Sequence, residues 1–175
     1  MSLLDKVTTQ VEGLVQTLRN LQYDPLLIGG VLRVAALGGS TADIDVALIV
    51  PSDDKYIHNT LKHLGFDLVH TQDSKYAGET NGFLADYRKD DVNIILYSAT
   101  VYIGVRDLVS SFDLNINKYY LKDGELCNDY FDGRVVLYTE NSNHQRHLDR
   151  ITRFSLEYPD LDWTQPQLEQ EQLSA

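Results

Sequence analysis

Apolar residues recur at every third or fourth position in the first part of the chain and predict an amphipathic helix that ends near Pro25. The apolar positions of this helix are Leu3, Leu4, Val7, Val11, Leu14, Leu18 and Leu21. A short apolar strand over residues 25–28 and a short helix over residues 31–37 come next. Residues 42–50 then form a run of apolar and β-branched side chains, which is typical of a buried strand.

The rest of the chain alternates between the same two patterns. Helices are expected after an N-cap at residues 51–53, over residues 100–109 and over residues 143–158, and strands over residues 66–70, 83–87, 92–97, 116–121 and 126–131. The last two strands form a hairpin, and the polar stretch 71–81 is expected to be a loop that can fold over a ligand. The pattern predicts an α/β (α+β) fold, a mixed β-sheet with flanking helices, over residues 1–158. A flexible, acidic, Gln-rich tail follows at residues 159–175.

The composition narrows the class of protein. The 175 residues suffice for one domain with a substantial core, and no apolar run is long enough to cross a membrane. The N-terminus lacks the basic and apolar regions of a secretory signal, so we expect a cytoplasmic protein. The single cysteine, Cys127, excludes an intramolecular disulfide and a cysteine-based zinc site.

The charge is strongly acidic and unevenly distributed. A net charge of −11 argues against broad nucleic-acid binding, which requires a cationic surface. A local basic cluster nevertheless precedes the acidic tail, and it consists of His144, Arg146, His147, Arg150 and Arg153. A small basic site in an acidic protein suits a nucleotide better than a long duplex. The two histidines lack a third metal ligand nearby and are expected to lie on an exposed helix face.

The strongest chemical signal is the pair Asp43 and Asp45 in the predicted strand 42–50. Residues two apart on a strand point to the same face, so the two carboxylates are expected side by side. Like charges held this close are costly unless a cation offsets them. A divalent metal such as Mg²⁺, which takes oxygen ligands and carries substrate phosphates, meets this need.

Three further residues precede the acid pair. Gly29 and Gly30 follow the short strand 25–28, where they allow the backbone to approach a phosphate group closely. Arg33 falls on the first turn of the next helix, placed to bind phosphate oxygens. Together these residues indicate a metal-dependent nucleoside triphosphate site. The alternative is a plain turn followed by a strand end that happens to carry two acids.

The residues from Leu27 to Val46 closely resemble a known signature. With its glycine pair, arginine and two acids, this segment is similar to the head domain of class II tRNA CCA-adding enzymes and bacterial poly(A) polymerases. These enzymes belong to the polymerase-β-like nucleotidyltransferase superfamily. Three later segments resemble family motifs in the expected order: 113–117 (Asp-Leu-Asn-Ile-Asn), 128–133 (Asn-Asp-Tyr-Phe-Asp-Gly) and 150–154 (Arg-Ile-Thr-Arg-Phe). The similarity spans about residues 25–158, a whole head domain.

The resemblance implies a nucleotidyltransferase-type fold and a role for each matched residue. Asp43 and Asp45 would be catalytic and hold Mg²⁺ (or Mn²⁺). The nucleotide and its phosphates would be bound by Gly29, Gly30, Arg33, Asp113, Asn117, Arg150 and Arg153. The expected activity is transfer of a nucleoside monophosphate from an NTP to a hydroxyl acceptor, which could be an RNA 3′ end such as that of tRNA, a protein or a small molecule.

Several positions depart from the family pattern and leave an alternative open. Val34 and Phe112 replace residues that are usually Asp and Arg, and Asn93 stands where members often carry an acid. Asp91 or Asp86 could supply a third acid. The family's base-selecting Glu-Asp-x-x-Arg motif is absent, so we expect a head-only enzyme rather than a full CCA-adding enzyme. A catalytically degenerate nucleotide- or partner-binding relative is the alternative, and a dimer that completes the site remains open.

Overall fold

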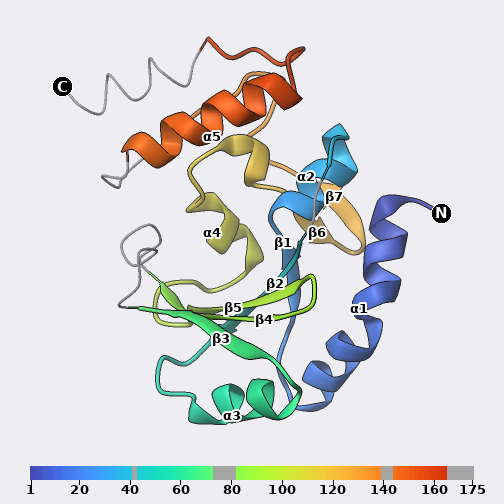
Figure 1. Cartoon of the computed structure of the whole chain (residues 1–175), viewed down its shortest axis with the longest axis vertical. Helices are drawn as coiled ribbons and strands as arrows, with labels where there is room; N and C mark the ends of the chain where they lie inside the picture. The colour runs from blue at the N-terminus through green and yellow to red at the C-terminus, as the bar shows by residue number, and fades with distance from the viewer. Residues whose placement is uncertain (41–42, 73–81, 139–143, 165–175) are drawn as a thin grey trace.

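The computed structural model describes residues 1–40, 43–72, 82–138 and 144–164 (Figure 1). A five-stranded sheet forms the centre, in the order β1-β2-β5-β4-β3. Its strands are β1 (Leu26–Ile28), β2 (Ile44–Val50), β3 (Asp67–Thr71), β4 (Phe83–Lys89) and β5 (Val92–Ser98). β2 and β5 run parallel, whereas the other neighbours pair antiparallel. The predicted mixed sheet with flanking helices is therefore confirmed.

The remaining elements surround this sheet. The helices are α1 (Leu3–Asn20), α2 (Gly30–Leu37), α3 (Lys55–His63), α4 (Val105–Ser110), the single 3₁₀ turn η1 (Asn115–Asn117) and α5 (His144–Glu157). A separate hairpin is formed by β6 (Tyr120–Lys122) and β7 (Glu125–Cys127). None of the described helices has the length and apolar character needed to span a membrane.

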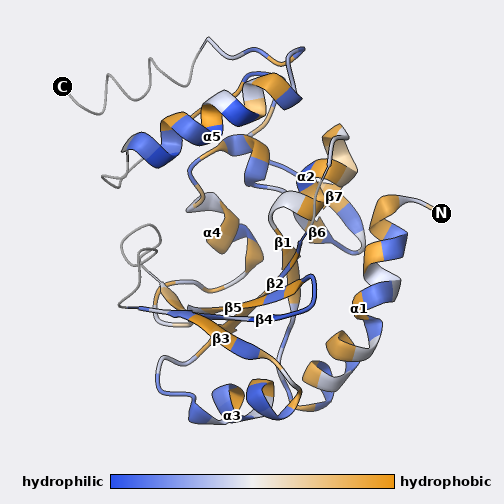
Figure 2. Ribbon diagram, viewed as in Figure 1, coloured by the Kyte–Doolittle hydropathy of each residue, from blue (hydrophilic) through white to orange (hydrophobic). Residues whose placement is uncertain are grey.

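Helices cover both faces of the sheet, and the alternation of side chains along the strands decides what each face carries. One face packs against α1 and α3 through a buried apolar cluster that includes Val11, Val46, Ile57 and Ile94. The apolar stripes of these helices are visible in Figure 2. The opposite face carries Ala47 and Tyr97 of β2 and β5, which pack against Leu108 and Val109 of α4. Asp45 shares this second face, because it lies two residues before Ala47 on the same strand.

The C-terminal helix α5 lies at one end of the molecule, beyond α4 (Figure 1). Its Phe154 packs in a third cluster with Leu114, Val135 and their neighbours. The chain that follows α5 stays attached, since Asp162 exchanges backbone hydrogen bonds with the 133–135 segment. The Trp163 Nε1 also donates to the carbonyl oxygen of Tyr158 at 2.8 Å. The expected tail therefore begins with residues 159–164 packed on the domain, and residues 165–175 lie outside the described residues.

Several predicted boundaries were wrong for local reasons. α1 ends at Asn20 because Gln22 adopts a left-handed conformation, and α3 is capped by Asp54 rather than by residues 51–53. α4 begins only after Gly104, since the preceding residues turn back onto Ser98. The hairpin strands are shorter than predicted because residues 115–117 form η1. Most of the predicted loop 71–81 lies outside the described residues.

Candidate functional site

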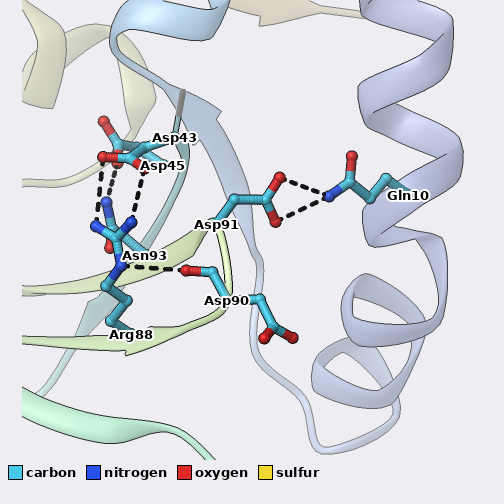
Figure 3. A network of polar contacts seen from close by, with 7 residues as sticks. All are labelled: Gln10, Asp43, Asp45, Arg88, Asp90, Asp91 and Asn93. Carbon is cyan, nitrogen blue, oxygen red and sulfur yellow. Dashed lines mark hydrogen bonds and ion pairs between the residues drawn. The ribbon is translucent and has the colours of Figure 1, made fainter. Parts of the chain in front are cut away.

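The two acids predicted to act together do lie side by side. Asp45 is in β2 and Asp43 directly precedes it, and Figure 3 shows both carboxylates facing Arg88 and Asn93. The Asn93 Nδ2 donates to Asp45 Oδ1 at 3.0 Å. The guanidinium of Arg88 forks onto Asp43, with Nη2 2.9 Å from Oδ1 and Nη1 3.4 Å from Oδ2. The two carboxylates share one face, as the two-residue spacing predicts.

The electrostatics of the pair favour a cation. Burial raises the pKa of Asp45 above its ordinary value, and the nearby charges of Asp43 and Asp86 raise it further. The hydrogen bond from Asn93 and the charge of Arg88 act in the opposite direction without cancelling the rise. The folded protein thus holds this carboxylate where ionisation is unfavourable, and positive charge arriving between the acids relieves that cost.

The glycine pair fits tightly against two other site residues. A Cβ at Gly29 would lie 2.7 Å from Asp45 Oδ2, and Gly29 has a φ of +77°, which favours glycine. The contact follows from the register, because Ile28 of β1 pairs with Asp45. A Cβ at Gly30 would lie 3.2 Å from Arg33 Nη2. This turn therefore has the acid pair beside its first glycine and the arginine beside its second.

Arg33 is held inside the protein. It is 8% exposed, its Nη1 donates to Asn117 Oδ1 at 2.5 Å, and its Nε donates to the Tyr158 hydroxyl at 3.2 Å. The Arg33 guanidinium also stacks on the Phe154 ring, 4.3 Å from its centroid. The structure thus brings together Arg33 and Asn117, both predicted to bind nucleotide. The Nη2 beside Gly30 is the side of the guanidinium that faces the glycine turn.

Two more of the arginines predicted to bind nucleotide lie near the Phe154 ring. The guanidinium carbons of Arg153 and Arg150 lie 4.6 Å and 6.0 Å from the Phe154 centroid. We refer to Arg33, Arg150 and Arg153 as the arginine cluster. It is a concentration of positive charge in a chain of net charge −11, which is the local condition that binding of a small anion requires.

Asp113 contacts the arginine cluster through Arg150. Arg150 Nη1 and His147 Nδ1 lie 2.5 Å and 2.8 Å from Asp113 Oδ2. Burial alone would raise the pKa of Asp113, but the contacts with His147, Arg150 and the Leu114 N–H outweigh it and lower the pKa. Burial in turn lowers the pKa of Arg150, against the opposing effect of Asp113. Asp113 therefore positions Arg150 rather than facing solvent as a free acid.

A buried asparagine holds the 113–117 segment in place. Asn115 is fully buried, and its Nδ2 donates to the carbonyl oxygens of Tyr130 and Arg134. Its Oδ1 accepts from the Val136 N–H at 2.9 Å. Every side-chain polar group of Asn115 is thus used to link this segment to residues 130–136, which explains how Asp113 and Asn117 are placed.

Asp91, the expected third acid, is engaged elsewhere. Asp91 accepts two hydrogen bonds of 3.0 Å from Gln10 Nε2 of α1 and points away from Asp45 (Figure 3). The structure does not bring Asp91 to the acid pair. Asp86 lies on the same face of β4 as Arg88, contacts His70 Nδ1 at 3.0 Å, and acts electrostatically on Asp45.

Sequence reasoning did not foresee the contacts of three residues of the site. Arg88, His147 and Tyr158 contact Asp43, Asp113 and Arg33, respectively. The expectation that His147 lies on an exposed helix face was wrong, since it is 4% exposed. Its position three residues before Arg150 places both on one helix face, and this spacing was the available signal.

The residues present partly fit a divalent metal. Asp43 and Asp45 offer the oxygen donors that Mg²⁺ or Mn²⁺ prefers, and burial raises the pKa of Asp45, so its ionised form gains from a nearby cation. Within the described ranges, however, no group of three or more His, Cys, Asp or Glu side chains could hold a metal ion. The acid pair therefore fits a cation that takes its other ligands from substrate phosphates and water.

Comparison with known proteins identifies the fold. No family model matches this sequence, and no curated protein matches it. The structure resembles a CCA-adding enzyme in its apo form, with a TM-score of 0.62, 18% identity and coverage of 97% of this chain and 43% of that one. A CCA-adding enzyme in complex with CTP gives a TM-score of 0.56, 20% identity and coverage of 87% and 40%. Thermotoga maritima CCA-adding enzyme complexed with tRNA gives a TM-score of 0.57, 19% identity and coverage of 86% and 37%.

These similarities are confined to part of each neighbour. The chain spans about two fifths of the length of these solved proteins. At such identities the likeness concerns the arrangement of the backbone, and it agrees with the resemblance found in the sequence motifs. This chain therefore has the fold that these CCA-adding enzymes show over about two fifths of their length.

Proposed function

We propose that this protein is a metal-dependent nucleotidyltransferase, which moves a nucleoside monophosphate from an NTP to a hydroxyl acceptor. The observation that carries the proposal is the position of the glycine turn. Gly29 lies against Asp45, and Gly30 lies against Arg33. A polyphosphate that follows this turn meets the acid pair on one side and the arginine on the other.

The proposed roles follow from these positions. Asp43 and Asp45 would hold Mg²⁺ or Mn²⁺, and Arg33 with the backbone of the glycine turn would contact the triphosphate. A bound metal would polarise the α-phosphate and offset charge on the departing pyrophosphate. The acceptor hydroxyl loses its proton to water and its oxygen forms a bond to the α-phosphorus as the bond to pyrophosphate breaks, so the protein mainly positions groups and balances charge.

The proposed substrate classes are supported by the solved neighbours and by the charge of the chain. The solved neighbours include CCA-adding enzymes with CTP, with ATP and with tRNA, which supports an NTP donor and an RNA 3′ end as acceptor. The net charge of −11 favours a short contact near the arginine cluster over a long RNA surface. A protein or a small molecule is the alternative acceptor.

The test is label transfer. The protein is incubated with each labelled NTP, Mg²⁺ and a panel of acceptors that includes tRNA lacking its 3′ end. Asp43→Ala and Asp45→Ala are expected to lower transfer by about a hundredfold or more, because each removes a proposed metal ligand. Asp132→Ala is the control, since Asp132 is an exposed acid that pairs with Arg134. Transfer that survives in Asp45→Ala would contradict the proposal.

A specific observation supports one alternative, a degenerate relative that binds a nucleotide or a partner without turnover. Arg88 and Asn93 already satisfy both acids with groups of this chain. Val34, which replaces a usual acid, is only 7% exposed and suits an apolar environment. Calorimetry with ATP and Mg²⁺ distinguishes the two functions, because binding without label transfer to any acceptor supports the relative.

A further inference from the structure

Arg88 makes a two-pronged contact with the acid that the proposed function assigns to metal binding. Its Nη2 lies 2.9 Å from Asp43 Oδ1 and its Nη1 lies 3.4 Å from Oδ2. Its Nε donates to the backbone oxygen of Asp90 at 3.1 Å, in the turn between β4 and β5 (Figure 3). The turn thus fixes the guanidinium, and the fork geometry matches a carboxylate.

The sheet register explains why Arg88 reaches this place. Asp45 of β2 pairs with Asn93 of β5, and Asn93 pairs with Arg88 of β4. These three residues form one row across neighbouring strands, and directly paired side chains lie close on the same face. Arg88 is therefore brought to the acid pair by the fold, 45 residues away from Asp43 in sequence.

The row offsets part of the negative charge of the acid pair. Arg88 carries one positive charge against the two carboxylates of Asp43 and Asp45, and Asn93 is neutral. Asn93 moreover donates a hydrogen bond to Asp45, whereas an acid in its place would repel it. A free divalent cation approaching Asp43 meets both the positive charge of Arg88 and a carboxylate already engaged.

We infer that Arg88 is an intrinsic counter-ion of Asp43 that competes with the divalent cation and is displaced when the cation binds. The inference rests on the proposed function, which assigns the acid pair to the metal. It implies that the free protein binds Mg²⁺ or Mn²⁺ weakly and takes its cation together with the triphosphate, whose oxygens complete the coordination. Arg88 is thus a positioning residue of the acid pair.

The test measures Mn²⁺ binding to the full chain without nucleotide, by calorimetry or by the electron paramagnetic resonance of free Mn²⁺. Arg88→Gln is expected to bind Mn²⁺ about fivefold tighter or more, because it removes a competing ion pair of about half-exposed groups and a nearby positive charge. Arg88→Lys keeps the charge but loses the fork, so a smaller increase is expected. Asn93→Asp adds a third acid and is also expected to tighten binding.

The matched control is Arg134→Gln. Arg134 forms an ion pair with Asp132 at 3.1 Å, and both side chains are more than half exposed. This variant removes the same charge from another surface and is expected to bind Mn²⁺ as the wild type does. A nucleotide-free thermal melt of each variant confirms that it is folded before the titration is interpreted.

The outcomes separate the inference from the proposed function. Equal Mn²⁺ affinity in Arg88→Gln and the wild type, with tighter binding in Asn93→Asp, overturns the counter-ion role and leaves the metal site standing. Failure of every variant to bind Mn²⁺, Asn93→Asp included, removes the acid pair as a cation site and both ideas with it. Tighter binding in Arg134→Gln as well reduces the effect to net charge and overturns the specific role of Arg88.

Discussion

Gly29 and Asp45 are in such close contact that no side chain fits between them. A Cβ at Gly29 would stand 2.7 Å from Asp45 Oδ2. The contact follows from the antiparallel pairing of β1 with β2, which sets Ile28 opposite Asp45 and brings the next residue beside the carboxylate. The backbone of the glycine turn therefore lies directly against the acid that is proposed to bind metal.

Gly29→Ala is expected to lower both stability and nucleotide transfer. Gly29 has φ +77° and ψ −149°, a conformation open essentially to glycine alone, so a Cβ there costs about 1–3 kcal/mol, and the new methyl group must push the Asp45 carboxylate aside. Gly124→Ala is the control, because Gly124 has a φ of +81° and nothing within 4 Å of its Cβ position. The control should lose stability through its own backbone strain and retain transfer. Equal transfer in both variants would show that the contact with Asp45 does not matter.

Asp45→Asn is expected to make the protein more stable at pH 7. Burial raises the pKa of Asp45, so its contribution to stability is full below the ordinary value of about 3.9 and is lost as the pH rises through the folded value. Asparagine keeps the oxygen that accepts from Asn93 and removes the charge. Urea denaturation at pH 7 should show a gain of about 1 kcal/mol.

The gain at Asp45 should disappear in acid. Near pH 3 the wild-type carboxyl is protonated, so the two proteins should have similar free energies of unfolding. Asp43→Asn is the matched variant, since Asp43 is 40% exposed and paired with Arg88, and its loss should change stability by at most about 1 kcal/mol. A variant Asp45→Asn that is less stable than the wild type at pH 7 would contradict the raised pKa.

The sequence predicted those parts of the fold and site that depend on local periodicity. The apolar run of β2 identified a buried strand, and the two-residue spacing of Asp43 and Asp45 placed them on one face. The glycine pair was recognised because few residues besides glycine tolerate such a turn. These signals lie within a few residues of one another, so no tertiary information was needed.

The remaining site residues depend on pairings between distant segments. Arg88 reaches Asp43 only because β4 joins the sheet beside β5. Asp91 accepts hydrogen bonds from Gln10, a residue 81 positions away. The burial of His147 depends on the packing of α5 over Asp113. Hydrophobic periodicity carries no information on strand order or on which helix covers a given acid, and so these contacts were missed.

Asp113→Asn is expected to destabilise the protein near neutral pH. It is also expected to make the free energy of unfolding depend less on pH in acid. Contacts with His147 and Arg150 outweigh burial and lower the pKa of Asp113, so its contribution is present above about pH 3.9 and lost as the pH falls through the folded value. Removing it leaves Arg150 without a buried partner, at a cost of about 3 kcal/mol.

The measurement for Asp113 is the free energy of unfolding at pH 6 and at pH 3. The difference between the wild type and Asp113→Asn should be largest at pH 6 and should shrink towards pH 3. Asp132→Asn provides the comparison, because Asp132 is also paired with an arginine but lies on the surface. A difference that stays constant with pH would assign the effect to packing instead of charge.

The buried Lys118 is expected to make the free energy of unfolding depend on pH above neutrality as well. Its Nζ is buried, donates to the Ser110 carbonyl oxygen at 2.8 Å, and lies 3.9 Å and 4.5 Å from the ring centroids of Tyr138 and Tyr130. Burial lowers the pKa of Lys118 to about 8, and the charge of Asp113 only partly opposes this. Between that value and the ordinary value of about 10.4, the folded protein binds fewer protons than the unfolded chain.

Stability should therefore rise with pH through this interval in the wild type and not in Lys118→Met. Methionine fills a similar volume and carries no charge, so the unfolding free energy of the wild type minus that of the variant should increase from pH 7 to pH 9.5. Groups that titrate in both proteins cancel in the comparison, which leaves the difference between the two curves to Lys118. Parallel curves over the window would mean that the ammonium is as well solvated in its tyrosine-lined site as in water.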